Sequence, residues 1–207
     1  MRLVKTVIMK KILLLWCLIL AGSSGTVAQQ VSLDVHPDTK MSISGTSTIH
    51  SWTSEVKECM GQIEIEEAYY KNGFKPGDRI SSVILSVPVK SIVSPRGAAM
   101  DKKTFEALKE DRFPQIRFTL TDNTVREVNG QVFVIEASGN LEIAGVKRTV
   151  TLTVNGKPDG NNRYQFTGSK KLNMREFEME PPTAMFGQIV TGEEVEINFT
   201  LIATKTN

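Results

Sequence analysis

The sequence has very few residues of the kinds that carry out chemistry. Its 207 residues include two histidines, His36 and His50, and two cysteines, Cys17 and Cys59. No pair among them has the spacing of metal ligands. The chain also lacks a glycine-rich phosphate loop, a dinucleotide fingerprint and a nucleophile elbow. We therefore predict no catalytic residue, no metal ligand and no cofactor site, and we expect a binding protein before an enzyme.

The excess of basic residues is confined to the start of the chain. Four of them precede ten consecutive apolar residues, Ile12–Ala21, and small residues then lead to Ala28. The four are Arg2, Lys5, Lys10 and Lys11. This is the layout of a secretory signal peptide, and ten apolar residues are too few to span a bilayer. We predict a signal peptide over residues 1–28, cleavage near Ala28, a periplasmic or extracellular location and no transmembrane span in the mature chain.

Residues 29–207 have almost balanced charge. They keep 21 basic and 23 acidic residues, a net charge of −2, so no basic excess points to a nucleic-acid partner. Their number suits a single domain with an adequate core. Cys59 has no second cysteine to pair with here. We expect a small buried hydrophobe, with a reactive thiol or the bridge of a homodimer as the alternatives.

What the chain does have is alternation of apolar and polar residues. Near its end Val195, Ile197, Phe199 and Leu201 share one parity while polar residues take the other. Side chains of a strand point alternately to its two faces, so such segments bury one face. Eight segments are expected as strands: Lys40–Ser44, Glu55–Glu66, Arg79–Val89, Gln115–Thr121, Gln131–Ile143, Val146–Val154, Arg163–Leu172 and Glu194–Ala203.

The lengths and connections of these segments predict an all-β fold, either a barrel or a sandwich. Short turns rich in Gly, Asn, Asp and Pro separate the later segments and favour antiparallel hairpins. The segments Glu55–Glu66, Arg79–Val89 and Gln131–Ile143 clearly exceed the usual five or six residues, which favours a barrel of long, tilted strands. Gly61 and Gly139 lie inside strand patterns and are expected to mark bulges or bends.

One helix interrupts the strands. Ser94 is expected to cap it, Pro95 suits the first helical position and Pro114 ends it. Phe105 and Leu108 fall on its apolar side, so the helix is expected to pack on, or plug, the sheet. Core packing and ligand contact are both open for these two side chains.

The segment between the last two strands is unusually apolar for a loop. Met174, Phe177, Met179, Met185 and Phe186 lie around two prolines. Such a loop is expected to fold back over a barrel mouth, either as a seal on the core or as a rim that faces a ligand.

The two readings of His50 also stay open. It lies beside Trp52 where the chain turns between strands. It is expected to pin this turn by hydrogen bonds, with contact to a polar headgroup or a proton-linked role as the alternative.

Several segments together resemble the YceI-like family. They are residues 45–52 (GTSTIHSW), the run 100–118, residues 139–146 (GNLEIAGV) and the C-terminal run 181–199. The resemblance covers roughly residues 38–204 and implies an eight-stranded antiparallel lipocalin-like β-barrel with one short helix packed against it. It also implies an isoprenoid or related lipid tail inside the barrel. Residues 45–52 replace the opening strand, rich in Phe and His, of the best-known members.

The leading functional hypothesis is a carrier or sequestering protein for an isoprenoid-type lipid or a quinone tail. Candidate lipid-binding residues are Val83, Leu85, Val87, Phe105, Leu108, Ile116, Phe118, Leu141, Ile143, Leu152, Phe166, Met174, Phe177, Met185, Phe186, Val195, Ile197 and Phe199. The alternatives are a cell-envelope stress or interaction protein with a filled core, and an enzyme that uses His50 on a tail-bearing substrate. Interior volume separates the first alternative from the carrier.

Overall fold

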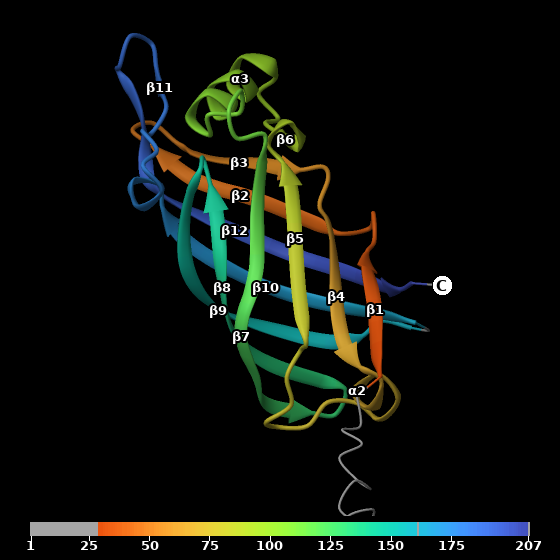
Figure 1. Cartoon of the computed structure of the whole chain (residues 1–207). Coiled ribbons are helices and arrows are strands. Elements are labelled where there is room, and N and C mark those ends of the chain that lie inside the picture. Colours follow the sequence, from red (N-terminus) through yellow and green to blue (C-terminus); the bar gives the residue numbers. More distant parts are fainter. Residues whose placement is uncertain (1–28, 161, 207) are drawn as a thin grey trace, which may run out of the picture.

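Eight strands close into an antiparallel barrel. The computed structural model describes residues 29–160 and 162–206, so the predicted signal peptide lies outside the described residues. The strand order is β1-β4-β5-β7-β8-β9-β10-β12, and β1 also pairs with β12, which closes the ring (Figure 1). The strands of the ring are β1 (Gln30–Val35), β4 (Met60–Glu66), β5 (Ser82–Pro88), β7 (Gln115–Asn129), β8 (Val132–Ile143), β9 (Val146–Pro158), β10 (Arg163–Asn173) and β12 (Ile189–Lys205). The predicted barrel is confirmed.

Three further strands extend this ring at one end. They are β2 (Lys40–Ser47), β3 (Ser51–Val56) and β6 (Ile92–Val93). β1 and β2 both pair with β12, one after the other, and β3 and β4 pair with β2 and β1 in the same way. β1 and β2 therefore form one long barrel strand with a break in the middle, and so do β3 and β4.

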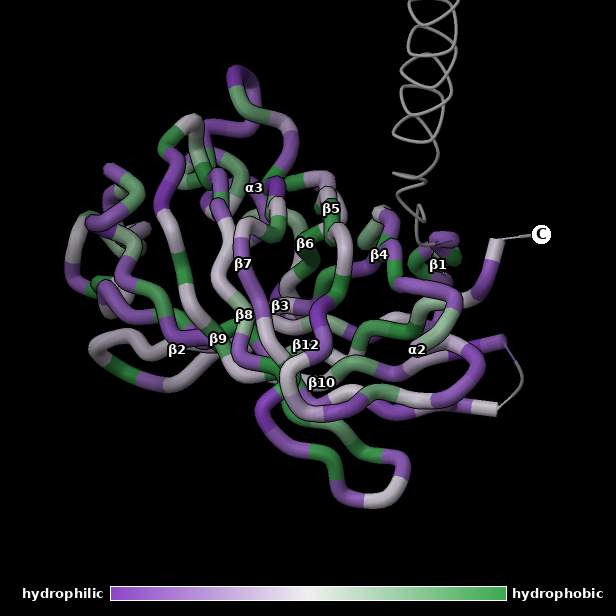
Figure 2. Tube along the Cα trace, turned by 60° about the horizontal axis from the view of Figure 1, so that its bottom comes forward, coloured by the Kyte–Doolittle hydropathy of each residue, from purple (hydrophilic) through white to green (hydrophobic). Residues whose placement is uncertain are grey.

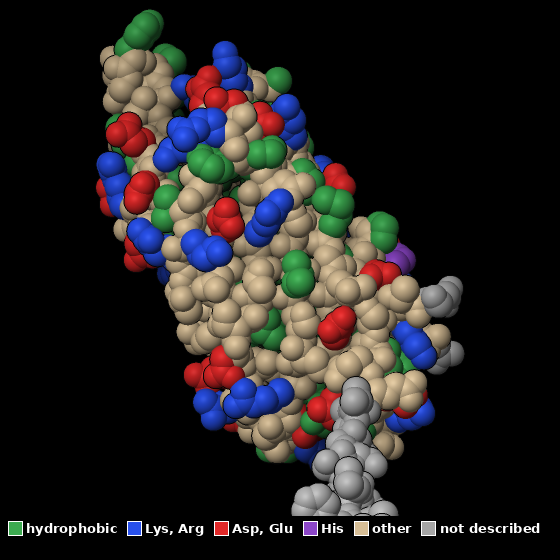
Figure 3. Space-filling view, in the orientation of Figure 1, with side chains coloured by type: hydrophobic (Ala, Val, Ile, Leu, Met, Phe, Trp, Pro, Cys, Tyr) green, Lys and Arg blue, Asp and Glu red, His purple; other side chains and the backbone are tan. Residues whose placement is uncertain are grey.

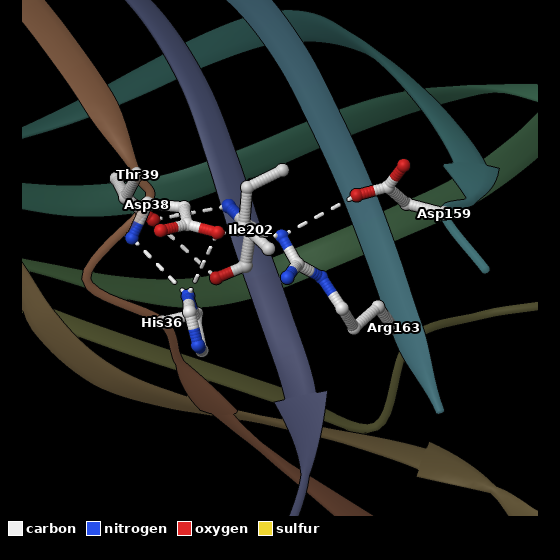
Figure 4. A network of polar contacts seen from close by, with 6 residues as sticks. All are labelled: His36, Asp38, Thr39, Asp159, Arg163 and Ile202. Atoms are coloured by element: carbon white, nitrogen blue, oxygen red, sulfur yellow. Dashed lines mark hydrogen bonds and ion pairs between the residues drawn. The ribbon is translucent and has the colours of Figure 1, made fainter. Parts of the chain in front are cut away.

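A polar network holds the break between β1 and β2 (Figure 4). The backbone N–H of His36 donates to the Ile202 carbonyl at 2.7 Å, and the Ile202 N–H donates to Thr39 Oγ1 at 3.0 Å. Arg163 donates to an Asp38 carboxylate oxygen at 3.0 Å and pairs with Asp159 at 3.5 Å. These contacts tie the bend to β10 and β12, which gives His36 a structural role.

The strand boundaries correct the sequence-based ones in several places, the largest being β7, which continues to Asn129 and not only to the expected Thr121. The strand Gln30–Val35 was not expected, because it is short and directly follows the leader. The segment expected as one strand, Glu55–Glu66, is two, since the Lys57 N–H leaves the ladder and donates to the Ser91 carbonyl. β12 begins five residues before the expected Glu194.

Gly139 marks a bend, as expected. It pairs with Leu120 of β7, and the register shifts between Leu120 and Asp122. A Cβ at Gly139 would lie 2.3 Å from the Phe118 ring, so the missing side chain gives this inward-facing ring its place. A bulge of this kind increases local twist and helps a sheet to curl.

The expected helix exists but begins later, and it ends at Ala107, well before Pro114. α3 spans Ala98–Ala107 with Gly97 at its N-cap, so the assignments of Ser94 as cap and Pro95 as first residue are wrong. Asp101 explains the difference, because its carboxylate accepts from the Ser94 N–H at 2.7 Å and holds the preceding loop. Further short elements are α2 (Glu67–Asn72), the 3-10 turns Val89–Ser91 and Met174–Phe177, and β11 (Thr183–Ala184).

Aromatic side chains fill the α2 end of the barrel. Phe133 stacks on Phe74 with ring centroids 4.3 Å apart and meets Tyr164 and Phe166 edge-on at 6.3 and 6.2 Å. Figure 2 shows apolar and polar residues alternating along the strands that surround this core. The α2 end is therefore solid, and α3 and β11 lie at the opposite end (Figure 1).

Candidate ligand cavity

An apolar cavity of about 370 Å³ lies at the α3 end of the barrel. Its walls come from strands, from α3 and from the turn at Met174–Phe177. The apolar residues of this wall include Ile43, Ile92, Leu108, Ile116, Ile143, Leu172, Met174, Phe177, Met179, Val195 and Ile197. Ligand pockets run about 300–1,000 Å³, so this outer cavity is large enough for a small molecule.

A second cavity of about 180 Å³ lies deeper in the barrel. Ile116 and Ile197 line both cavities, so the two spaces adjoin at these side chains. The walls of this inner cavity include Met41, Cys59, Val83, Leu85, Val87, Phe118, Leu141, Val150, Leu152, Phe166 and Phe199. Phe74, Phe133, Tyr164 and Phe166 form the aromatic cluster at the α2 end, which we call the aromatic plug. Because Phe166 lines the inner cavity and packs against Phe133, this cavity ends at the plug.

Strand alternation produces this interior. Val195, Ile197 and Phe199 of β12 lie on the apolar parity predicted to face inward, and all three line a cavity. Gly168 of β10 pairs with Phe199, and a Cβ at Gly168 would lie 2.7 Å from the Phe199 ring. A large side chain thus faces a glycine, which leaves the adjoining space open.

The mouth of the outer cavity is polar on one side. Arg96 Nη1 lies 2.6 Å from His50 Nε2, and Lys103 Nζ donates to the Thr183 carbonyl at 2.5 Å. Arginine is only a donor, so His50 accepts through Nε2 and carries its proton on Nδ1, beside Ser47 Oγ. Among the described residues lining this cavity, the charged ones are Arg96 and Lys103, both basic.

Hydrogen bonds pin the turn that carries His50, as expected. Ser47 Oγ donates to the His50 carbonyl at 2.8 Å, and the indole of Trp52 donates to the Thr46 carbonyl at 3.0 Å. The Trp52 ring covers Gly45, where a Cβ would lie 2.6 Å from the ring. The turn therefore holds His50 and Trp52 at the cavity wall.

Fifteen of the candidate lipid-binding residues line one cavity or the other. They are Val83, Leu85, Val87, Leu108, Ile116, Phe118, Leu141, Ile143, Leu152, Phe166, Met174, Phe177, Val195, Ile197 and Phe199. Phe105 instead packs against the core residues around Leu108, outside both cavities.

Met185 and Phe186 are the clear correction. The first half of their loop folds inward, with Met174, Phe177 and Met179 buried. The tip does not, since Met185 is 65% exposed, Phe186 is fully exposed and neither lines a cavity. The reason is the hairpin formed by β11 and β12, whose turn points both side chains outward.

Sequence reasoning missed the polar residues of the mouth and several wall residues. Arg96 and Lys103 carried no motif, and they approach His50 and Thr183 only through the fold. Met41 and Ile43 had a usable signal, since they share one parity in the predicted strand Lys40–Ser44. Ile92 lies on a two-residue strand, which is too short for a pattern to appear.

Cys59 is a wall residue of the inner cavity. Burial raises the pKa of its thiol from 9.0 to about 11, because the thiolate would lose its solvation. The neutral thiol is therefore the stable form, and Cys59 acts as a small apolar group. Among residues 29–160 and 162–206, no three His, Cys, Asp or Glu side chains come together as metal ligands would.

The sequence matches the family model described as the YceI-like domain over residues 26–203. The chain belongs to the YceI-like family. This match spans most of the chain and includes every barrel strand except the last residues of β12. A search of the curated proteins finds no match.

Solved structures show the same fold at low sequence identity. BcnA of Burkholderia cenocepacia is 20% identical with a TM-score of 0.62, over 83% of this chain and 100% of its own. A polyisoprenoid-binding domain from Saccharophagus degradans, implicated in plant cell wall breakdown, is 11% identical with a TM-score of 0.66, over 86% and 100%. The YceI protein of Campylobacter jejuni is 14% identical with a TM-score of 0.57, over 74% and 85%.

This chain has an eight-stranded barrel with an apolar interior, as its membership of the YceI-like family implies. None of the helices in the described part of the chain is long and apolar enough to cross a bilayer.

Proposed function

We propose that this protein carries or sequesters an amphiphile with one long isoprenoid-type tail, such as a polyprenyl lipid or a quinone, outside the cytoplasm. In this proposal residues 1–28 are a signal peptide and residues 29–207 form one binding domain without catalytic activity. The observation that carries the proposal is the pair of adjoining apolar cavities, which share Ile116 and Ile197 and end at an aromatic plug.

The tail is held by burial alone. Each CH₂ group removed from water contributes about 0.8 kcal/mol, so a tail of isoprene units needs no charged anchor along its length. The inner cavity suits this, because nearly all of its lining is aliphatic or aromatic. The polar or charged residues of its lining are Asn123, whose side chain is bonded to the Ile80 backbone, and Lys170, which donates to the Thr151 carbonyl.

The headgroup lies at the polar mouth. Arg96, His50 and Lys103 stand there beside the hydroxyl groups of Ser47 and Thr104. Donors of this kind bind an oxygen-rich headgroup, and two cations favour one that carries negative charge. A tail inward and a headgroup at the mouth is the orientation that this lining supports.

The interaction protein with a filled core is the second candidate. It requires side chains to occupy the barrel interior. The outer and inner cavities of about 370 and 180 Å³ favour the carrier instead. The enzyme alternative has less support, since His50 is engaged by Arg96 and no carboxylate among the described residues lines the outer cavity beside it.

The test is binding of two ligands with the same tail, geranylgeraniol and geranylgeranyl phosphate. Trp52 is the one tryptophan of residues 29–207 and lines the outer cavity, so its fluorescence reports occupancy. We expect saturable one-to-one binding of both ligands, tighter for the phosphate. Organic extraction and mass spectrometry of the purified protein provide the independent check. The proposal is overturned if the protein takes up neither ligand and no lipid co-purifies with it.

A further inference from the structure

Large apolar side chains are exposed at the tips of two neighbouring hairpins. Ile49 lies in the turn between β2 and β3, and Met185, Phe186 and Val190 lie in the hairpin of β11 and β12. We call these four residues the apolar tip. The Thr48 N–H donates to the Val190 carbonyl at 3.0 Å, and the Val190 N–H donates to Thr48 Oγ1 at 3.3 Å. The two hairpins are thus fixed to one another.

The backbone at the end of this tip is strained. Met185, Phe186 and Gly187 have φ values of 51°, 54° and 87°, which lie in the left-handed region. Glycine and asparagine adopt this region readily, whereas bulky side chains rarely do. Met185 and Phe186 therefore cost free energy in conformation and again in their exposure to water. An apolar environment around the tip would offset the second cost.

The apolar tip stands at the mouth of the outer cavity. Thr183, Ala184 and Ile189 belong to the same hairpin and line that cavity, as does His50, which follows Ile49. Figure 3 shows apolar side chains at the far end of this hairpin and, beside it over α3, Lys and Arg side chains with Asp and Glu among them.

Two of the basic side chains are joined directly to the two hairpins. Arg96 bonds to His50, next to Ile49, and Lys103 bonds to Thr183 at the base of the β11 hairpin. Apolar groups that project beyond a basic rim are the features with which a protein enters the interface of an anionic bilayer.

We propose that the apolar tip inserts into the surface of an anionic lipid bilayer and places the cavity mouth against it. The inference rests on the proposed function, because a tail that leaves a bilayer for the cavity then never crosses water. The form of the tip favours a bilayer over a protein partner. Met185 and Phe186 project from a narrow turn, whereas protein interfaces bury side chains in a well-packed patch.

The first experiment measures sedimentation with vesicles of phosphatidylcholine and phosphatidylglycerol. The test variant is the double replacement Met185→Asn and Phe186→Asn, because asparagine tolerates the left-handed backbone and the hairpin keeps its turn. The matched control is Met60→Asn with Ile84→Asn, two exposed apolar residues on the barrel wall. We expect the test variant to lose at least about tenfold in vesicle affinity and the control to match the parent. Pure phosphatidylcholine vesicles should bind the parent more weakly.

The second experiment separates docking from tail binding. Geranylgeraniol is offered to each protein either in dilute detergent or in the mixed vesicles. We expect the test variant to take it up normally from detergent and at least about tenfold more slowly from vesicles. Equal vesicle affinity of parent and test variant overturns the docking proposal. So does a change of the test variant in oligomeric state alone, which assigns the tip to self-association. Vesicle binding without any uptake by the parent, even from detergent, refutes the proposed function and leaves the docking intact.

Discussion

Blocking the passage between the two cavities should abolish the gain in affinity that a long tail has over one short enough to end in the outer cavity. Ile197 lines both cavities, and the substitution Ile197→Trp places a larger side chain where they adjoin. A tail that ends in the outer cavity is then unaffected, while a longer tail loses access to the inner one. Ile84→Trp on the outer surface of β5 is the matched control.

The size of the effect follows from the inner volume. If a CH₂ group takes about as much room as a water molecule, roughly 30 Å³, the inner cavity of about 180 Å³ holds about six of them. At about 0.8 kcal/mol for each CH₂ group, the lost burial amounts to about 5 kcal/mol, or more than about a thousandfold in Kd. Overpacking by tryptophan should lower the stability of the barrel by about 1–3 kcal/mol at most.

Isothermal titration calorimetry measures this prediction with geraniol, farnesol and geranylgeraniol, because the introduced tryptophan would add its own fluorescence to that of Trp52. The parent should bind more tightly at each step of tail length. The Ile197→Trp protein should gain nothing beyond the length that fills the outer cavity, although it unfolds cooperatively and binds geraniol like the parent. An unchanged dependence on tail length in this variant would refute the end-to-end arrangement of tail and cavities.

Three further predictions concern stability and the headgroup. Phe133→Ala should lower the free energy of unfolding by about 3–5 kcal/mol, because Phe133 is 2% exposed and its loss opens a void in the aromatic plug. Urea titration measures this against the exposed control Val132→Ala, which should stay within about 0.5 kcal/mol of the parent, and equal losses would contradict the solid plug. The raised pKa of Cys59 favours the neutral thiol in the folded state, so its contribution to the free energy of unfolding is complete below pH 9.0 and is lost as pH rises toward about 11. Over this range the free energy of unfolding of the parent should fall by up to about 2 kcal/mol more than that of Cys59→Ala, and the same pH dependence in both proteins would contradict the burial of the thiol. Arg96→Gln should remove at least about 1 kcal/mol of the preference for geranylgeranyl phosphate over geranylgeraniol and leave the affinity for the alcohol unchanged. Fluorescence titration measures both affinities, and the control Arg126→Gln on the outer wall of β7 should retain the whole preference.

The barrel and its walls could be predicted from the sequence because burial follows strand parity. Val195, Ile197 and Phe199 illustrate this, since an alternation of period two places all three side chains on the inner face. Parity does not show how much of the interior stays empty. That depends on contacts between distant strands, such as Phe199 against Gly168, which appear only once the register is known.

The mouth and the tip could not be predicted in the same way. Arg96 reaches His50 across 46 positions of the chain, and Lys103 reaches Thr183 across 80, so no local pattern joins them. For Met185 and Phe186, composition indicated burial, but a short hairpin turn overrides composition and directs both side chains outward. The start of α3 was misplaced for a similar reason, because Asp101 satisfies the Ser94 N–H from inside the helix.

A crystal structure of residues 29–207 with bound geranylgeranyl phosphate tests the central claim most directly. The account predicts continuous ligand density from a phosphate beside Arg96 and Lys103, past Ile116 and Ile197, to the face of Phe166. Density confined to the outside of the barrel, or an interior closed by rearranged side chains, would contradict it.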